Sequence, residues 1–443
     1  MHQPLSRPHP GIALVAALAI LVAALAGPAC AKDDLLEVLA QKGVITMEEY
    51  EKLKAQQKAS EPTVSTDGGF KITSGDGALS MQVGTLQQID VASYHDDDPD
   101  VSFGGGMELR RSRIYLQGSY GPNWQYKAEY DFSTGVSTFT DLYASWSGWK
   151  HLLLTMGNFK QPFSMEALTS ARYGTTFMER GLPFAFVTLR AAGLMLGSSG
   201  ANWYLSGGLF GEPIGNVSTG GDEGRGIAAR GSYAPFFTND HVLHLGLGIT
   251  SREPTEDNVT TSAGEKITSV RFRSKPESNI LSQRLVDTGD IANVDRYEVV
   301  ALELAGEIKA FSAQGEYFGT RVMRDIGEDL DFSGWYLQVA YTLTGEARPY
   351  RGDRGYFDTI KPRTAVGDGG WGAWEVALRM SELDLTDGDI DGGRERDATL
   401  GVNWYMNRWI KLMGNLVKVM DIDGGPFDGV EPVIYEMRFQ FLL

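Results

Sequence analysis

Apolar and polar residues alternate along a series of short segments that begins at about Leu79 and continues to Leu443. The clearest is "NWQYKAEYDF", in which aromatic residues and one Ala take every second position and polar residues take the others. The segments "GWYLQVAYTLTG", "AWEVALRMS" and "ATLGVNWYM" repeat the pattern. A period of two residues is typical of β-strands that have one apolar and one polar face.

The character of the two faces predicts a barrel in a membrane. The apolar face is rich in Trp, Tyr and Leu, with aromatic residues near strand ends, where a membrane interface holds them. The polar face carries charged and amide side chains along whole strands. A soluble β-sandwich or lectin-like fold would also alternate, but its apolar faces would meet in a core. We therefore predict an all-β fold, a transmembrane antiparallel β-barrel.

The connections give the expected size of this barrel. At roughly 22–24 residues per strand and connection, the region from Leu79 to Leu443 predicts about 16 strands, enough to leave a water-filled channel. Gly121–Asn123 and Tyr405–Trp409 are short, and we expect them to be periplasmic turns. Arg252–Lys266 and Tyr350–Gly369 are long and polar, and we expect them to be external loops.

The composition agrees with this fold. The chain has 54 Gly, 18 Tyr and 9 Trp residues, as expected of many turns and aromatic belts. Its mean hydropathy is −0.20, which does not argue against a barrel, because lipid-facing and lumen-facing residues alternate. The formal net charge of −17 argues against nucleic acid as a partner.

The first 31 residues have the pattern of a cleaved secretory signal peptide. Arg7 precedes an apolar run that ends in "PACA", in which Ala29 and Ala31 form an A-x-A cleavage site. Cleavage after Ala31 would remove Cys30, the only cysteine, so we expect neither disulfides nor thiolate metal sites. A lipoprotein acylated on Cys30 is the alternative.

A short helical unit is expected between the signal peptide and the barrel. Gly43 is a candidate helix end, and Thr46 with Glu49 has the spacing of a capping box for a second helix. The unit is too small for a core of its own, so it either packs against copies of itself or is a solvated stub. The predicted division is 1–31 signal peptide, 32–60 periplasmic helical or coiled-coil segment, 61–77 linker and 78–443 barrel.

Three stretches carry a resemblance to a known family. "ELRRSRIYLQGSYGPNWQYKAEYDF", "MGNFKQPFSMEALTSARYGTTFMERGLP" and "TLGVNWYMNRWIKLMGN" together resemble the phosphate-selective porin O and P family of Gram-negative outer membranes. The resemblance implies a 16-stranded trimeric porin in which the third external loop folds inward to narrow the pore. It also implies that lines of Arg and Lys guide anions. The chain departs from the family's usual end, since its last residue is Leu443 rather than an aromatic residue.

Cations on the polar faces are the candidate functional residues. A charge on the lipid face near the midplane would cost about 2–4 kcal/mol, so alternation directs these side chains to the lumen or the interface. The cations expected to line the lumen or its mouth are Arg111, Arg113, Lys127, Arg271, Arg273, Lys275 and Arg379. By resemblance, the inward loop contributes Arg172, Tyr173, Glu179, Arg180 and Arg190.

These cations suggest passive movement of anions, because guanidinium and ammonium groups replace part of an ion's hydration shell. Phosphate or another small oxyanion is the expected solute. Two alternatives stay open. In the first, acidic residues on the same faces brace the wall of a weakly selective general porin. In the second, the external loops are the working surface of a structural or adhesive outer-membrane protein. The acidic residues are Glu129, Asp131, Asp141, Glu375 and Glu436.

The sequence has no legible catalytic constellation, and we expect neither a cofactor nor a metal site. "DGDIDGG" begins like a calcium loop, but Ala398 stands where the twelfth ligand would be, so a solvated hairpin tip is expected. His241 and His244 are expected on either side of a turn, solvated or facing the lumen. The expected partners are outer-membrane lipid, two further copies in a homotrimer, small anions and the barrel assembly machinery.

Overall fold

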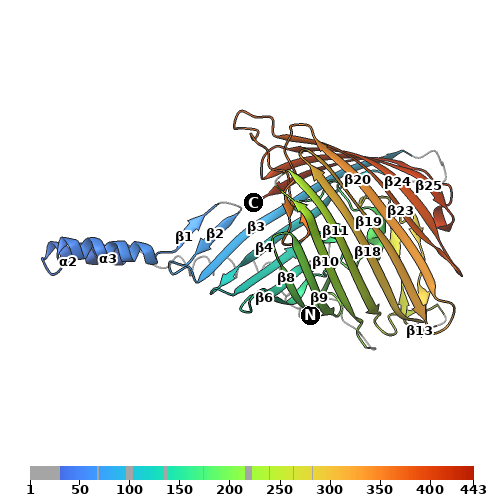
Figure 1. Ribbon diagram of the computed structural model, residues 1–443, viewed down its shortest axis with the longest axis horizontal. Helices are drawn as coiled ribbons and strands as arrows, with labels where there is room; N and C mark the ends of the chain where they lie inside the picture. The colour runs from blue at the N-terminus through green and yellow to red at the C-terminus, as the bar shows by residue number, and fades with distance from the viewer. Residues whose placement is uncertain are drawn as a thin grey trace, which may run out of the picture.

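The computed structural model describes residues 30–443 except 67–68, 96–102, 134–137, 173, 215–221, 239, 263 and 282. The proposed signal peptide therefore lies almost wholly outside the described residues, and so does Tyr173 of the expected inward loop. Figure 1 shows a barrel of tilted strands with a pair of helices projecting from one end.

Sixteen antiparallel strands form the barrel, and the pairing of the last strand, β26, with the first, β3, closes it. This confirms the predicted fold. Closure leaves no unpaired edge, as a lipid environment requires. The strands are β3 (Leu79–His95), β4 (Gly106–Tyr120), β5 (Trp124–Asp131), β6 (Thr138–Trp146), β7 (Leu153–Lys160), β8 (Arg190–Ser199), β9 (Trp203–Phe210), β10 (Arg225–Phe237), β11 (His241–Glu253), β18 (Val294–Ile308), β19 (Phe311–Arg324), β20 (Leu330–Thr342), β23 (Ala373–Asp387), β24 (Ile390–Tyr405), β25 (Ile410–Asp423) and β26 (Val433–Leu442).

Alternation along the strands separates an apolar exterior from a polar interior. On β20, Leu337 and Tyr341 are exposed on the outside, whereas Gln338 between them is buried inside. On β23, Leu378 is 48% exposed and the adjacent Arg379 is 1% exposed. The predicted assignment of the two faces is thus confirmed on these strands.

The residues before the barrel form two helices and two short strands. The helices are α2 (Cys30–Gln41) and α3 (Met47–Ser60), and Thr46 and Glu49 form the predicted capping box. The expected linker contains β1 (Thr63–Ser65) and β2 (Phe70–Thr73), and β2 pairs with β3. Among the described helices, none combines the length and apolar character needed to cross a membrane.

The two ends of the barrel carry different connections. We call the end where β3 begins and β26 ends the turn end, and the opposite end the loop end. The expected turns at 121–123 and 406–409 lie at the turn end, and the long connection 254–293 lies at the loop end, as predicted. Tyr350–Gly369 lies at the turn end, because it connects β20 to β23. The prediction of an external loop there was wrong, since strand order rather than loop length decides the end.

Three long connections fold into the barrel and supply much of its core. The loop 161–189 contains α4 (Met165–Leu168) and η1 (Leu182–Phe186). The loop 254–293 and the segment 343–372 contain only short strands. The buried cluster of Phe186, Phe272 and Phe318 joins the two loops to β19, and Met165 packs in one cluster with Phe357.

The short strands of these connections are β12 (Val259–Thr260), β13 (Lys266–Ile267), β14 (Ser269–Val270), β15 (Arg273–Ser274), β16 (Val286–Asp287), β17 (Ile291–Ala292), β21 (Tyr350–Arg351) and β22 (Tyr356–Phe357). A last 3-10 turn, η2 (Gly425–Phe427), lies between β25 and β26.

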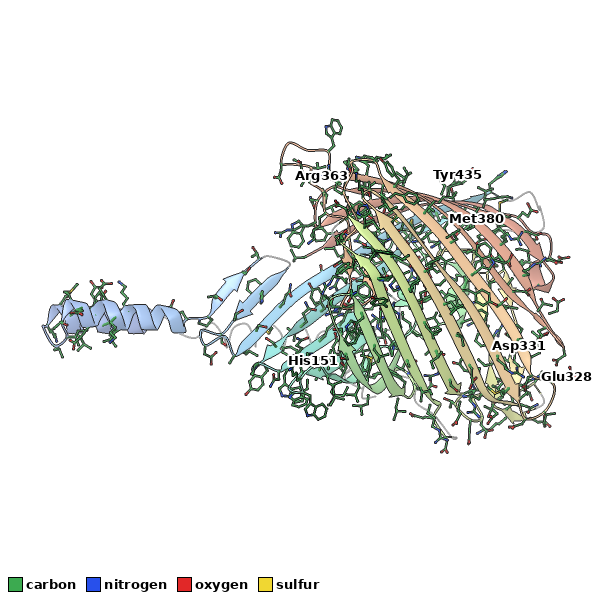
Figure 2. All side chains as sticks on the ribbon, in the orientation of Figure 1. His151, Glu328, Asp331, Arg363, Met380 and Tyr435 are labelled. Atoms are coloured by element: carbon green, nitrogen blue, oxygen red, sulfur yellow. The ribbon has the colours of Figure 1, made fainter. Side chains whose placement is uncertain are left out.

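The position of the segment 343–372 at the turn end predicts from which side of the membrane a thiol-reactive reagent can reach a cysteine placed in it. Arg363 in this segment lies at the end of the barrel opposite Glu328 (Figure 2). A Cys replacing Glu328 should react in intact cells with a polymer-linked maleimide too large for the pore. A Cys replacing Trp371, which is 80% exposed, should react only after the outer membrane is permeabilised. The matched control is Pro122→Cys in a short turn, which should behave as Trp371→Cys does. Labelling of Trp371→Cys in intact cells would contradict this topology.

Candidate functional site: the charged interior of the barrel

The loop 161–189 spans the interior of the barrel. Near its start, the carboxylate of Glu316 on β19 accepts hydrogen bonds from the backbone N–H groups of Met165 and Glu166, each at 2.9 Å. Further along, Lys411 on β25 donates to the carbonyl oxygen of Thr175 at 2.8 Å. Asn403 on β24 donates to the next carbonyl at 2.7 Å. The loop is thus fixed to walls on two sides, as the resemblance implied.

Glu179 is the centre of an ion-pair network on this loop. The guanidinium group of Arg110 binds its carboxylate through two hydrogen bonds of 2.8 and 2.9 Å. Arg438 on β26 donates to Glu179 at 2.7 Å and also forms two bonds with Asp90, at 2.7 and 2.6 Å. Two wall arginines therefore hold the loop by its acidic residue.

A β-bulge explains why the sequence did not reveal Arg110. Gln88 on β3 pairs with Arg111 and the next residue, Ile89, pairs with Leu109, so Arg110 has no partner in the register. The extra residue lets Arg110 and Arg111 both face inward. Strict alternation assigned only Arg111 to the lumen. Arg111 is buried there and donates to the side-chain oxygen of Gln88 at 2.6 Å.

A second network covers the wall from β4 to β8. Each cation of this network has a carboxylate partner. This is the arrangement expected if acidic residues brace the wall of a weakly selective general porin. The pairs are Arg113 with Asp131 (2.6 Å) and Glu129 (3.2 Å), Lys127 with Asp141 (2.5 Å) and Glu129 (3.2 Å), Arg172 with Glu129 (2.9 Å), and Arg190 with Asp141 (2.7 Å). The guanidinium of Arg172 also lies 3.9 Å from the ring centre of Tyr115.

Arg379 binds a residue of the loop 254–293. Its Nε donates to Glu277 at 3.0 Å, and Ser381 donates to the same carboxylate at 2.6 Å. Arg379 and Glu277 each have side chains that are 1% exposed. Arg379 also donates to the carbonyl oxygen of Glu179 at 3.0 Å. One wall arginine thus joins both loops.

The stretch "VRFRSKPES" lies in the loop 254–293 rather than in a barrel strand. Phe272 is buried, while Arg271 and Arg273 on either side of it are exposed. Arg271 forms two hydrogen bonds of 2.7 Å with Asp287. Among the described residues, Arg273 has no carboxylate at ion-pair distance.

Lys275 completes this cationic row. Its ammonium group donates to the carbonyl oxygen of Asn279 at 2.7 Å. Burial and the positive charge of nearby Arg284 lower the pKa of Lys275 below its ordinary value. Lys275 is thus partly buried, with Arg284 as its strongest charged influence.

Several partly buried cations bind backbone carbonyl oxygens rather than carboxylates. Lys160 at the end of β7 donates to the carbonyl oxygens of Ala167 (2.5 Å) and Thr169 (3.1 Å). Arg180 donates to those of Glu166 and Thr169, each at 3.1 Å. A carbonyl oxygen satisfies a donor but leaves the cation's charge uncompensated. Lys160 was not among the predicted residues.

The segment 343–372 is held by the wall beside β10, β11 and β18. Arg230 binds Glu303 through two bonds, at 2.7 and 2.6 Å, and donates to the carbonyl oxygen of Gly355 at 2.6 Å. His244 lies between Tyr350 (2.6 Å) and Glu303 (3.0 Å). His241 and His244 belong to one strand, β11, so the expected turn between them was wrong, although His244 does face the interior.

The buried Arg379–Glu277 pair predicts a large effect on stability. Arg379→Met would leave the Glu277 carboxylate buried without its counter-charge, and should lower the free energy of unfolding by about 3–5 kcal/mol. Urea titration of the protein refolded in detergent micelles, followed by tryptophan fluorescence, would measure the change. The control is Arg225→Met, since the side chains of Arg225 and Glu253 are 78% and 43% exposed and a solvent-exposed pair should contribute little to stability. Equal effects of the two variants would contradict the burial of the Arg379–Glu277 pair.

Among the described residues, no group of three or more His, Cys, Asp or Glu side chains is arranged to hold a metal ion. The interior is a charged passage shaped by three inward connections. Many of its acidic and basic groups form ion pairs, whereas some cations donate to carbonyl oxygens and some buried carboxylates accept from neutral donors.

Comparisons with known proteins agree with this architecture. Porin O of Pseudomonas aeruginosa is 26% identical over 397 residues, which cover 80% of this chain and 86% of that protein. An uncharacterized protein of Caulobacter vibrioides is 31% identical, covering 77% of this chain and 68% of its own length. An anion-selective porin from Comamonas acidovorans has a similar fold, with a TM-score of 0.51 and 16% identity over 82% of this chain and all of that one. The family model for phosphate-selective porin O and P matches residues 81–443, and the chain belongs to this family of outer-membrane porins.

Proposed function

We propose that this porin conducts small hydrophilic anions, phosphate or similar oxyanions, by passive diffusion past the cations of its two inward loops. The observation that carries the proposal is a set of cations on the inner wall and the inward loops that have no carboxylate at ion-pair distance among the described residues. They include Arg111, Lys160, Arg180, Lys275 and Lys411, together with the exposed Arg273. Because these charges are not neutralised locally, they favour anions over cations.

The chemistry of these groups suits repeated weak binding. An anion that enters the passage loses part of its hydration shell, and N–H donors on fixed cations replace the lost water. Conduction also requires release, so each site must bind weakly. A series of cations spread over two loops and the wall meets both requirements, because no single group must hold the ion alone.

The paired wall supports a second candidate, a weakly selective general porin. Arg113, Lys127 and Arg190 all have acidic partners. Their charges are therefore partly cancelled, and these residues brace the wall more than they attract anions. Selectivity would then depend on the carbonyl-bonded cations of the loops. A structural or adhesive role has less support, since the long loops pack inward.

Assembly and export complete the proposal. We infer that the chain forms a homotrimer, since one solved structure of similar fold, OmpT of Vibrio cholerae (TM-score 0.52, 10% identity), is described as a trimer form. Outer-membrane lipid would surround the apolar belt. Export would use the signal peptide 1–31, and insertion would use the barrel assembly machinery. The family indicates a channel rather than an enzyme.

Replacing the cations of "VRFRSKPES" by Gln tests the anion pathway. Arg273→Gln with Lys275→Gln should lower the anion-to-cation permeability ratio several-fold, because both cations lack a carboxylate partner. Adding Arg271→Gln should change the ratio little further, since Asp287 already neutralises Arg271. Reversal potentials of single channels in a salt gradient, and phosphate block of the chloride current, are the measurements. Wild-type values in the double variant would show that these residues lie outside the pathway.

The lowered pKa of Lys275 predicts a dependence on pH. A lysine whose pKa is below its ordinary value loses its charge earlier as the pH rises. The anion preference of the wild-type channel should therefore decline under alkaline conditions before that of Lys275→Arg, because Arg remains protonated. Reversal potentials measured from neutral pH upward would show the difference. Identical pH profiles would mean that Lys275 does not contribute to selectivity.

A further inference from the structure

Two buried carboxylates on β24 have no hydrogen-bond partner. Glu395 and Asp397 both have an exposed fraction of 0%. Within the described residues, none of their four carboxylate oxygens accepts a hydrogen bond. The two residues are separated by one position on a strand, so their side chains share its inward face. Buried ionised carboxylates without donors or a counter-charge are strongly destabilising.

The residues paired directly with these carboxylates on the neighbouring strands include no cation. Glu395 and Asp397 are flanked in register by four residues of β23 and β25, of which three are apolar and buried. These residues are Leu383, Ser381, Ile422 and Val419. The hydroxyl of Ser381 is donated to Glu277 instead. The two carboxylates therefore lie in an apolar part of the wall.

The loop 254–293 covers the pair on both sides along the strand. On one side, Val286 of β16 packs against Gly393 of β24. Its Cγ1 atom would lie only 3.2 Å from a Cβ atom added to Gly393, so β16 lies directly over β24. On the other side, the hydroxyl of Thr399 donates to Glu277 of the same loop at 2.5 Å. Glu395 and Asp397 lie between these two contacts, so the loop closes the site from the lumen.

The charges of this region do not balance. Glu277, Glu395 and Asp397 are three carboxylates, and within the part of the chain that the structure describes Arg379 is the one cation bonded to any of them. Its guanidinium group binds Glu277. Glu395 and Asp397 are thus buried without an ion-pair partner of their own among the described residues.

We propose that Glu395 and Asp397 bind a hard divalent cation, Mg²⁺ or Ca²⁺, between β24 and the loop 254–293. Carboxylate oxygens are the ligands these ions prefer, and a charge of two matches the uncompensated charge of the pair. The described residues hold no third acidic or histidine ligand in place. Bound water or backbone carbonyl oxygens therefore complete the coordination, as is usual for Mg²⁺ held by one or two carboxylates. The ion fastens the loop to the wall.

Metal content measured on the full-length mature protein tests this proposal. The protein should be refolded in detergent without lipopolysaccharide, whose phosphates bind divalent ions themselves. After loading with Mg²⁺ or Ca²⁺ and gel filtration in metal-free buffer, elemental analysis should find one divalent ion per chain. The result with each metal alone identifies the preferred ion. Competition with Mn²⁺, followed by electron paramagnetic resonance, gives the same count on wild-type protein.

The variant Glu395→Gln with Asp397→Asn should lose this ion. The matched control is Glu328→Gln with Asp331→Asn, which removes the same charge at an exposed hairpin (Figure 2) and should keep the ion. Chelation should lower the unfolding temperature of the wild type and control but not of the double variant. Wild-type protein that binds no divalent ion would overturn the proposal and indicate that protons neutralise the pair. Equal binding by the wild type and a folded double variant would also overturn it. If that variant fails to fold, the number of divalent ions bound per wild-type chain decides.

Discussion

The pairing of β26 with β3 is the interaction on which the rest of the structure depends. In a lipid environment an unpaired backbone N–H or C=O group is very costly, so a sheet must close on itself. Closure fixes which side of every strand faces lipid and which faces the interior. Leu378 and Arg379 are neighbours in the chain, yet one lies outside and the other inside for this reason. The polar interior is therefore a consequence of closing the barrel. Its polar and charged side chains need hydrogen-bond and ion-pair partners, and the inward connections supply many of them.

Those connections determine the electrostatics of the interior. Where a wall cation meets an acidic side chain, as Arg438 meets Glu179, the charge is cancelled and the contact braces the loop. Where it meets a carbonyl oxygen, as Lys411 meets that of Thr175, the donor is satisfied but no acidic side chain pairs with it. A protein with a formal net charge of −17 can thus have an interior that favours anions, because only the local balance of charge acts on an ion in the passage.

Some features of the site followed from the sequence and others did not. Lys127 and Arg379 were assigned to the interior because their strands keep a strict alternation. Arg110 was missed because a bulge adds one residue to β4, and nothing in the local pattern marks it. The segment 343–372 was assigned to the wrong end because its length resembles that of an external loop. Glu129, Asp131 and Asp141, which pair with Arg113, Lys127 and Arg190, were among the acidic residues that the sequence placed on the polar faces. Glu277, the partner of Arg379, was not, because it lies in a loop 102 positions away in the chain.

By itself, the sequence determined that the chain forms a barrel of about 16 strands, which face is apolar, and that cations line the interior. These properties depend on local periodicity and residue type, which a single strand already contains. Only the tertiary structure decided which cations keep their charge, which connections enter the barrel, and that Glu395 and Asp397 meet beneath a loop without a partner. Such contacts join residues a hundred or more positions apart, as Arg379 and Glu277 are, and their energies depend on burial, which no local pattern records.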